Sequence, residues 1–383
     1  MRSAGRRSSP WPTALETAAR SVANRVVALD LLLAVLAGST GCSDAAGAQV
    51  DLVRLSGRTM GTTWEVLLPR PVFDAKPTAG TNIQEPEGAL QQRIQDELDA
   101  VNAEMSTYMQ GSELSRFNAS TATDWVTVSP SLVHVVQTAQ SVYDKSHGAL
   151  DVTVAPLVDL WGFGPAKKRA APPSDAEIEA ARAAVDAKQL DARTDPPALR
   201  KRTPKLHVDL SSTAKGHGVD RVGAVLDHLG FAAWWVEVGG EVRVRGKKAP
   251  NTPWRVAIEL PGSTSTRSSE RTIDLKELAV ASSGDYRNFF VHEGQAYHHI
   301  IDPRTGRPPK QSVAQASVFA NDCETADAWA TALIVLGERD ALAIAEAENL
   351  AVLLLVRDPA VERGFRSVVS PAYEERVQPG APK

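Results

Sequence analysis

Apolar residues recur every three or four positions in several stretches of the chain, which is the spacing of one face of an α-helix. A helix is predicted over 129–148, because Ser129-Pro130 is typical of a helix start and Gly148 of a helix end. The same spacing predicts helices over 90–105, 174–185, 213–229 and 324–336.

Shorter runs rich in β-branched and aromatic residues predict strands between these helices. Many of them follow one another directly, with tight turns such as Gly239-Gly240 between them. This order favours an α+β fold, with mostly antiparallel sheets packed against helices, over a doubly wound parallel sheet. The predicted strands are 59–68, 206–210, 233–238, 242–245, 254–260, 273–281, 287–291, 297–301, 313–320 and 350–356.

Two other stretches differ from these elements. Residues 69–88 are rich in Pro, Gly and Thr and are predicted to be a loop insertion, and 188–204 is polar, contains Pro196-Pro197 and is predicted to be exposed. The loop 70–88 and the segment 165–204 look specific to this chain.

The first 42 residues have the pattern of an export signal. Residues 1–25 contain five arginines and one acid, 26–37 are apolar apart from Asp30, and small residues lead to Cys42. A cysteine at this place resembles a bacterial lipobox, although Ser39 stands where Leu is usual. We expect export and a lipid anchor at Cys42 on the periplasmic face of the inner membrane. The alternatives are a plain cleaved signal or a wrongly assigned start.

Composition narrows the class of protein. Of 383 residues, 43% are hydrophobic and 23% charged, as in ordinary globular proteins. The net charge of −4 gives no basic excess for nucleic acid. The two cysteines, Cys42 and Cys323, exclude a disulfide scaffold and a cysteine-rich metal site.

Four polar residues are candidates for chemistry. Asp327 and Thr331 lie four apart on a predicted helix, so they share a face and offer hard oxygen ligands for Mg²⁺, although such a pair is more often simply solvated. Lys215 follows a strand and a turn of small residues at a helix start, where phosphate can bind; the bland alternative is a surface lysine. His299 precedes a Pro/Gly turn and could carry a proton near neutral pH.

The segment 149–164 combines small residues, two aromatics and a proline. It is either shaped around a planar ligand or a well-packed turn.

Taken together and in order, these pieces resemble the ApbE family of flavin transferases. The matching motifs are Met60-Gly61-Thr62, Met105-Ser106-Thr107-Tyr108, Ser112 to Asn118, Gly148 to Gly164, Lys215-Gly216 with Asp220, Gly239-Gly240-Glu241, Ser283 to Arg287, His299 to Gly306, and Ala326 to Thr331. The resemblance implies an ApbE-like, T-fold-related domain over 58–370, possibly in two subdomains, with 43–57 as a tether and 371–383 as a flexible tail.

The resemblance also implies a reaction. Such enzymes bind FAD with Mg²⁺ and move its FMN half onto a Ser or Thr hydroxyl of an acceptor protein, releasing AMP. Family acceptors include flavin-carrying subunits of membrane redox complexes. The chemistry then consists mainly of positioning the reactants and neutralising phosphate charge.

The roles that the resemblance implies can be stated residue by residue. Asp327, Thr331 and the backbone carbonyl of Ser212 would hold Mg²⁺, and His299 would activate the acceptor hydroxyl. The flavin would be contacted by Met60, Tyr108, Ala149, Leu150, Asp151, Lys215, Asp285 and Ile301. Two alternatives use the same residues: an Mg²⁺-dependent FAD pyrophosphatase, and a non-catalytic FAD-binding lipoprotein.

Overall fold

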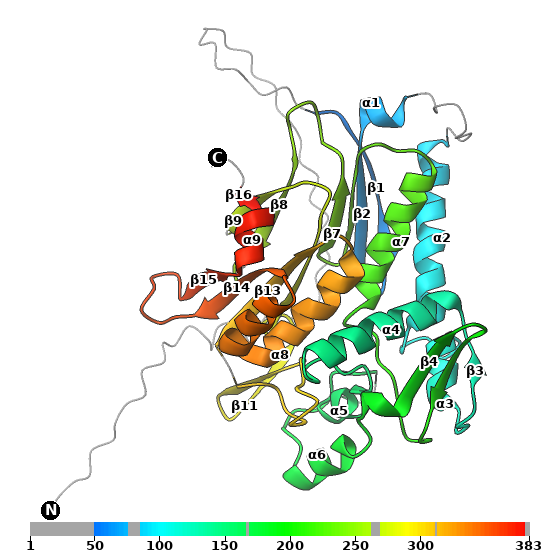
Figure 1. Ribbon diagram of the computed structural model, residues 1–383, viewed down its shortest axis with the longest axis vertical. Coiled ribbons are helices and arrows are strands. Elements are labelled where there is room, and N and C mark those ends of the chain that lie inside the picture. The colour runs from blue at the N-terminus through cyan, green and yellow to red at the C-terminus, as the bar shows by residue number, and fades with distance from the viewer. Residues whose placement is uncertain (1–49, 76–84, 166–167, 262–268, 311, 380–383) are drawn as a thin grey trace, which may run out of the picture. The chain divides into compact units, whose positions relative to one another are not determined.

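The computed structural model describes residues 50–75, 85–165, 168–261, 269–310 and 312–379 (Figure 1). The predicted signal over 1–42, with Cys42, lies outside them. In the part of the chain that is described, no helix is long and apolar enough to cross a membrane.

The described residues are organised around one eight-stranded sheet in the order β1-β2-β6-β7-β10-β13-β14-β15 (Figure 1). Every pairing in it is antiparallel. With the helices that pack on it, the sheet confirms the predicted α+β class. Its strands are β1 (Leu52–Thr59), β2 (Thr62–Pro69), β6 (Trp234–Val238), β7 (Glu241–Arg245), β10 (Ala279–Gly284), β13 (Val313–Ala320), β14 (Ala351–Arg357) and β15 (Phe365–Val369).

Both faces of this sheet are covered, which explains why β13 and β14 are almost entirely buried. One face packs against α2 (Glu87–Met105) and α7 (Ala214–His228) near β1, β2 and β6, and against α4 (Pro130–Lys145) and α8 (Cys323–Ala347) near β10 and β13. The other face packs against β8 (Trp254–Glu259), β9 (Ser269–Leu275) and α9 (Pro371–Arg376). Neighbours on β13 divide accordingly: Val318 joins the helical core and Phe319 the opposite one.

Shorter elements complete the domain. The strands β3 (Val126–Thr127), β5 (Pro197–Lys201) and β4 (Leu190–Thr194) form one small sheet, β16 (Gln378–Pro379) joins β9, and β11 (Phe289–His292) pairs with β12 (Gln295–His298). The remaining helices are α1 (Arg70–Phe73), α3 (Glu113–Ala119), α5 (Ala155–Leu160), α6 (Asp175–Arg182) and the short 3₁₀ turn η3 (Ala187–Gln189).

The predicted helix starts are confirmed by their caps. The Ser129 hydroxyl accepts a hydrogen bond from the Leu132 amide, and Ser174 forms a reciprocal capping box with Glu177. The predicted helix end at Gly337 is also confirmed, because Gly337 leaves the helical conformation with φ 75° and ψ 172°. A second helical segment, which the sequence analysis did not predict, follows this kink and continues to Ala347, and both segments are included in α8.

Both predicted ends of the domain need correction. Residues 52–57 were expected in a tether, yet they belong to β1, because Val53 and Leu55 are buried against α2 and α7. The expected flexible tail begins with α9 and continues into β16. Ala372 and Tyr373 anchor α9 to the sheet and are each 4% exposed.

Three segment predictions were also wrong. The stretch 188–204, expected to be exposed, forms the β4–β5 hairpin, in which Ala198, Leu199 and Lys201 are buried. The single strand expected over 273–281 is two strands, β9 and β10, separated at Glu277, which has a φ of 52°. The loop expected over 69–88 contains α1 and the beginning of α2, and its residues 76–84 lie outside the described part.

The segment 206–210 is not a strand, and the structure shows why. The Asn118 side chain takes the place of a neighbouring strand: its amide nitrogen donates to the Val208 carbonyl at 2.8 Å, and its oxygen accepts from the Val208 amide at 2.8 Å. A side chain therefore satisfies the backbone here without a ladder.

Candidate functional site

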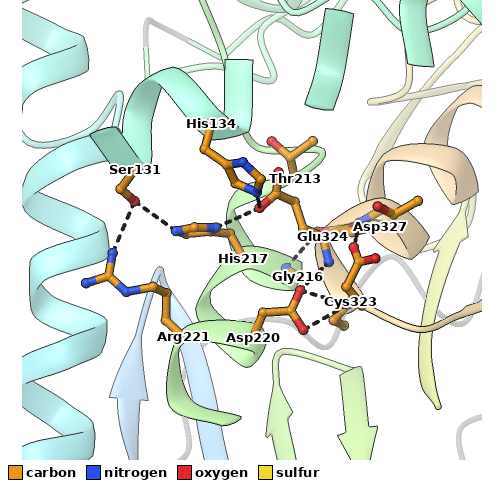
Figure 2. A network of polar contacts seen from close by, with 12 residues as sticks. Ser131, His134, Thr213, Gly216, His217, Asp220, Arg221, Cys323, Glu324 and Asp327 are labelled. Atoms are coloured by element: carbon orange, nitrogen blue, oxygen red, sulfur yellow. Dashed lines mark hydrogen bonds and ion pairs between the residues drawn. The ribbon is translucent and has the colours of Figure 1, made fainter. Parts of the chain in front are cut away.

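The N-terminal ends of α7 and α8 meet at Gly216. A Cβ atom at this position would lie 2.3 Å from the carbonyl oxygen of Cys323, so only glycine permits this approach. The Gly216 amide donates to Oδ2 of Asp327 at 3.0 Å, which binds the two helices together (Figure 2). Two residues distant in sequence, Lys215 and Asp327, are thereby brought close to each other.

Asp220 fixes the start of α8. Its Oδ2 accepts hydrogen bonds from the amides of Cys323 at 2.8 Å and Glu324 at 2.9 Å (Figure 2), and Arg243 donates to its Oδ1 at 2.7 Å. A carboxylate at a helix N-terminus satisfies amides that have no partner inside the helix and interacts favourably with the helix dipole.

The centre of the site is a cluster of one half-buried ammonium and two buried carboxylates. Nζ of Lys215 lies 2.6 Å from Oε1 of Glu241 and 3.7 Å from Oδ1 of Asp327. Each carboxylate residue is 3% exposed. The three residues come from α7, β7 and α8.

Burial and mutual charge shift the pKa values of this cluster. Burial raises the pKa of Asp327 to about 7, helped by the nearby charge of Glu241 and opposed by Lys215. For Lys215 burial acts to lower the pKa, but the charges of Asp327 and Glu241 outweigh it and the pKa is raised. The lysine is therefore a firmly held cation.

The predicted metal ligands lie around this cluster. Thr331 is one turn beyond Asp327 on α8, and its Oγ1 lies 3.1 Å from Oγ of Ser283 on β10. Ser212 is half-buried in the turn before α7, where Asp209 accepts hydrogen bonds from Ser211. No group of three or more His, Cys, Asp or Glu suited to a metal occurs in the described ranges, so a cation here would need hydroxyl, carbonyl, water or substrate oxygens as well.

His299 is held with a defined tautomer. The carbonyl of Asn288 accepts from the His299 amide at 3.0 Å and lies 3.2 Å from Nδ1. Because a carbonyl can only accept, Nδ1 carries the proton and Nε2 keeps a lone pair. Burial lowers the pKa of His299 to about 4, so the ring is neutral at pH 7.

An aromatic wall adjoins His299. Phe163 meets the imidazole edge-on with ring centroids 6.3 Å apart and stacks on Phe290 at 5.7 Å, and Phe290 stacks on Tyr297 at 5.3 Å. Trp161 stacks on Tyr297 and donates from Nε1 to the Gly306 carbonyl at 2.8 Å. The segment 149–164 and the turn after His299 are thus packed together.

The predicted flavin contacts have very different surroundings. Tyr108 is 67% exposed, Met60 occupies a turn between β1 and β2 with φ 48°, and Ala149 and Leu150 are buried in the helical core. Ile301 is buried beside Trp161 in a separate cluster.

The two predicted acidic contacts already have partners. Asp151 accepts from the Thr153 amide and hydroxyl and from the Ala187 amide. Asp285 forms a two-pronged ion pair with Arg357 at 2.7 and 2.8 Å. A flavin contact from either would have to share these bonds.

Sequence reasoning missed a polar chain that joins three helices beside the cluster (Figure 2). Arg221 donates to Ser131 Oγ at 3.1 Å, Ser131 Oγ lies 2.9 Å from His217 Nε2, and His217 Nδ1 lies 2.7 Å from Glu324. Its members flank the site, because His217 is two residues after Lys215 and Glu324 three before Asp327. Glu241 was also given no role, although its Gly-Gly-Glu motif was visible.

Fold and site together define an α+β protein with a lysine–carboxylate cluster suited to phosphate and divalent-cation chemistry. Residues 60–354 match the model of the ApbE family. The curated FAD:protein FMN transferase of Vibrio cholerae is 41% identical over 353 residues, covering 92% of this chain and 98% of that protein. That of Haemophilus influenzae is 39% identical, with 86% and 93% covered. This chain belongs to the ApbE family.

Solved structures of ApbE proteins have the same fold. The flavin transferase ApbE from Vibrio cholerae aligns with a TM-score of 0.75 and 40% identity, over 86% of this chain and 100% of that one. The apo form of the Pseudomonas stutzeri flavinyl transferase ApbE aligns with a TM-score of 0.74 and 33% identity, over 86% and 97%.

Proposed function

We propose that this protein is an FAD:protein FMN transferase. It moves the FMN half of FAD onto a Ser or Thr hydroxyl of an acceptor protein and releases AMP. The observation that carries the proposal is the convergence of Lys215, Glu241 and Asp327 in a chain so similar to proteins named for this activity.

The donor set beside this cluster fits magnesium. Asp327 offers a buried carboxylate oxygen, Oδ1, which lies 3.7 Å from the Lys215 ammonium. Thr331 offers a hydroxyl one turn along the same helix, and Ser212 a backbone carbonyl. All three are hard oxygen donors of the kind Mg²⁺ prefers, and one or two protein ligands with water and phosphate are usual for this ion. When bound, Mg²⁺ neutralises charge on the phosphate oxygens.

The protein's own residues then place the reactants. Lys215 supplies a fixed positive charge for the diphosphate, and Nε2 of His299 accepts the proton of the acceptor hydroxyl. The hydroxyl oxygen forms a new bond to the FMN-side phosphorus while the bond from that phosphorus to the bridging oxygen breaks. The bridging oxygen leaves with AMP.

The decisive test is the mass of the acceptor. The protein is incubated with FAD, Mg²⁺ and a co-expressed candidate acceptor that carries a Thr or Ser site, and the intact acceptor is weighed. A gain of one FMN unit with release of AMP supports the proposal. Free FMN without acceptor labelling would identify a pyrophosphatase instead, and FAD that stays intact for hours would identify a binding protein.

The cellular setting is proposed from the sequence. Export through residues 1–42, with a lipid on Cys42, would place the site on the periplasmic face of the membrane, where a flavin-carrying subunit of a membrane redox complex is a suitable acceptor. Metabolic labelling with a fatty acid tests the anchor. We expect a labelled wild-type protein and an unlabelled Cys42→Ser variant, and an unlabelled wild type would refute anchoring.

A further inference from the structure

Glu241 occupies an unusual position beside the proposed metal ligands. It begins β7 directly after the Gly239-Gly240 turn, and it is 3% exposed. One carboxylate oxygen, Oε1, lies 2.6 Å from the Lys215 ammonium. The other, Oε2, is buried and has no hydrogen-bond partner among the described residues. A buried carboxylate with only one of its oxygens engaged is costly, so such a residue calls for a functional reason.

Two carboxylates compete for the Lys215 ammonium. Its Nζ is closer to Glu241 than to Asp327, 2.6 Å against 3.7 Å, and at equal dielectric the nearer charge attracts about 1.4 times as strongly. The lysine stem passes close to the turn before β7, since a Cβ on Gly239 would lie 3.2 Å from its Cδ. The Lys215 side chain therefore lies on the β7 side, where Glu241 is its nearer carboxylate.

The position of this ammonium decides whether Asp327 is free to bind a cation. Oδ2 of Asp327 already accepts from the Gly216 amide, so Oδ1, which faces Lys215, is the less occupied oxygen. If the ammonium moved onto Oδ1, a positive charge would stand where a divalent cation has to bind.

We propose that Glu241 is a positioning residue that holds Lys215 away from Asp327, so that Asp327 can bind the divalent cation while Lys215 faces the diphosphate. This rests on the metal site of the proposed function. It assigns Glu241 no contact with the metal and no part in the proton transfer. Glu241 acts through the lysine.

The experiment measures cation binding rather than turnover. Mn²⁺ is titrated into the full-length protein with saturating FAD and no acceptor, and free Mn²⁺ is followed by electron paramagnetic resonance. We expect Glu241→Gln to weaken Mn²⁺ binding by about 10- to 100-fold, the usual effect of losing a residue that orients a metal ligand. Glu237→Gln is the matched control, because Glu237 lies four residues earlier and accepts from the Gly240 amide, a bond that glutamine can keep. It should stay within about threefold of wild type.

A double variant separates this mechanism from a direct effect of the lost charge. Removing the lysine removes the competitor, so Lys215→Met/Glu241→Gln should bind Mn²⁺ within about threefold of Lys215→Met alone. If the double variant binds Mn²⁺ about 10-fold or more weakly than Lys215→Met, Glu241 acts independently of Lys215 and the proposal is overturned. Thermal unfolding of each variant shows whether it is folded.

Two further outcomes distinguish this inference from the proposed function. If Asp327→Asn abolishes Mn²⁺ binding but Glu241→Gln leaves it unchanged, the metal site stands and only the role of Glu241 fails. If the wild-type protein binds no Mn²⁺ with FAD present, the metal site itself fails, and with it the inference.

Discussion

Substituting Gly216 by alanine should separate activity from stability. The new Cβ would meet the carbonyl oxygen of Cys323 at 2.3 Å, whereas real Cβ contacts below 3.0 Å are essentially never seen. The carbonyl oxygen is a backbone atom and the position of Cβ is fixed by the backbone, so neither can rotate away and the helices α7 and α8 have to move apart. Restoring an ordinary contact requires a shift of about 1 Å.

This shift acts directly on the cluster, because Lys215 is next to Gly216 and Asp327 accepts the Gly216 amide. A misplacement of about 1 Å at a catalytic site costs about 100-fold in rate. The free energy of unfolding should change much less than the rate. Overpacking destabilises a protein by about 1–3 kcal/mol, and alanine in place of glycine inside a helix stabilises it by about 1 kcal/mol.

The assay is initial FMN transfer with thermal unfolding measured in parallel. Gly218→Ala is the control, because a Cβ there meets only the ends of the Leu98 and Met60 side chains, both at 3.2 Å, which can rotate. We expect about 100-fold loss for Gly216→Ala and less than about threefold for Gly218→Ala. A Gly216→Ala enzyme within threefold of wild type would show that the close approach of the helices does not set the site geometry.

Three other predictions follow from the same geometry. Because the pKa of His299 is lowered to about 4, its ring stays neutral above that pH, so transfer at saturating Mg²⁺, which also keeps Asp327 deprotonated, should be level from about pH 8 to 5.5 and fall toward pH 4. An inflection near pH 6.5 that stays in place when Mg²⁺ is raised further would contradict the neutral base, whereas one that moves with Mg²⁺ belongs to Asp327. His299→Ala should lose about 100- to 10,000-fold in rate with FAD affinity nearly unchanged. Asp327→Asn should lose metal-dependent turnover while keeping a cooperative thermal transition, and normal turnover would move the metal site elsewhere. Asp220→Ala removes two helix-capping bonds and leaves Arg243 unpaired, so denaturant unfolding should show that the free energy of unfolding falls by about 2–3 kcal/mol. An unchanged denaturation midpoint would show that Asp220 does not stabilise the start of α8.

Elements with a strong local pattern were predictable from the sequence. The helices α2, α4 and α7 carry an apolar stripe at helical spacing. The strand β14 is an apolar run up to Arg357, and β13 is apolar apart from Gln315 and Ser317, because both strands are buried on the two faces of the sheet. Ser129 and Ser174 marked helix starts because capping is a local interaction.

Prediction from the local sequence pattern failed where residues distant in sequence decide the structure. The segment 206–210 has the composition of a strand, but its partner is a side chain 90 positions away, Asn118, and no periodicity reports such a contact. Residues 52–57 and 371–376 looked like chain ends because their few apolar residues find a core only after the sheet has assembled. In the β4–β5 hairpin, polar residues conceal strands whose inner face rests on α4.

The same distinction between local and distant interactions applies to the site. The sequence by itself shows which groups are available for chemistry: a lysine at a helix start, an acid and an alcohol one turn apart, and a histidine before a tight turn. The tertiary structure alone decided that Lys215, Glu241 and Asp327 share one buried space, and that Glu241 takes part at all. The physical reason is that charge coupling depends on distance and burial, and both are set here by the close passage of α7 and α8 at a glycine.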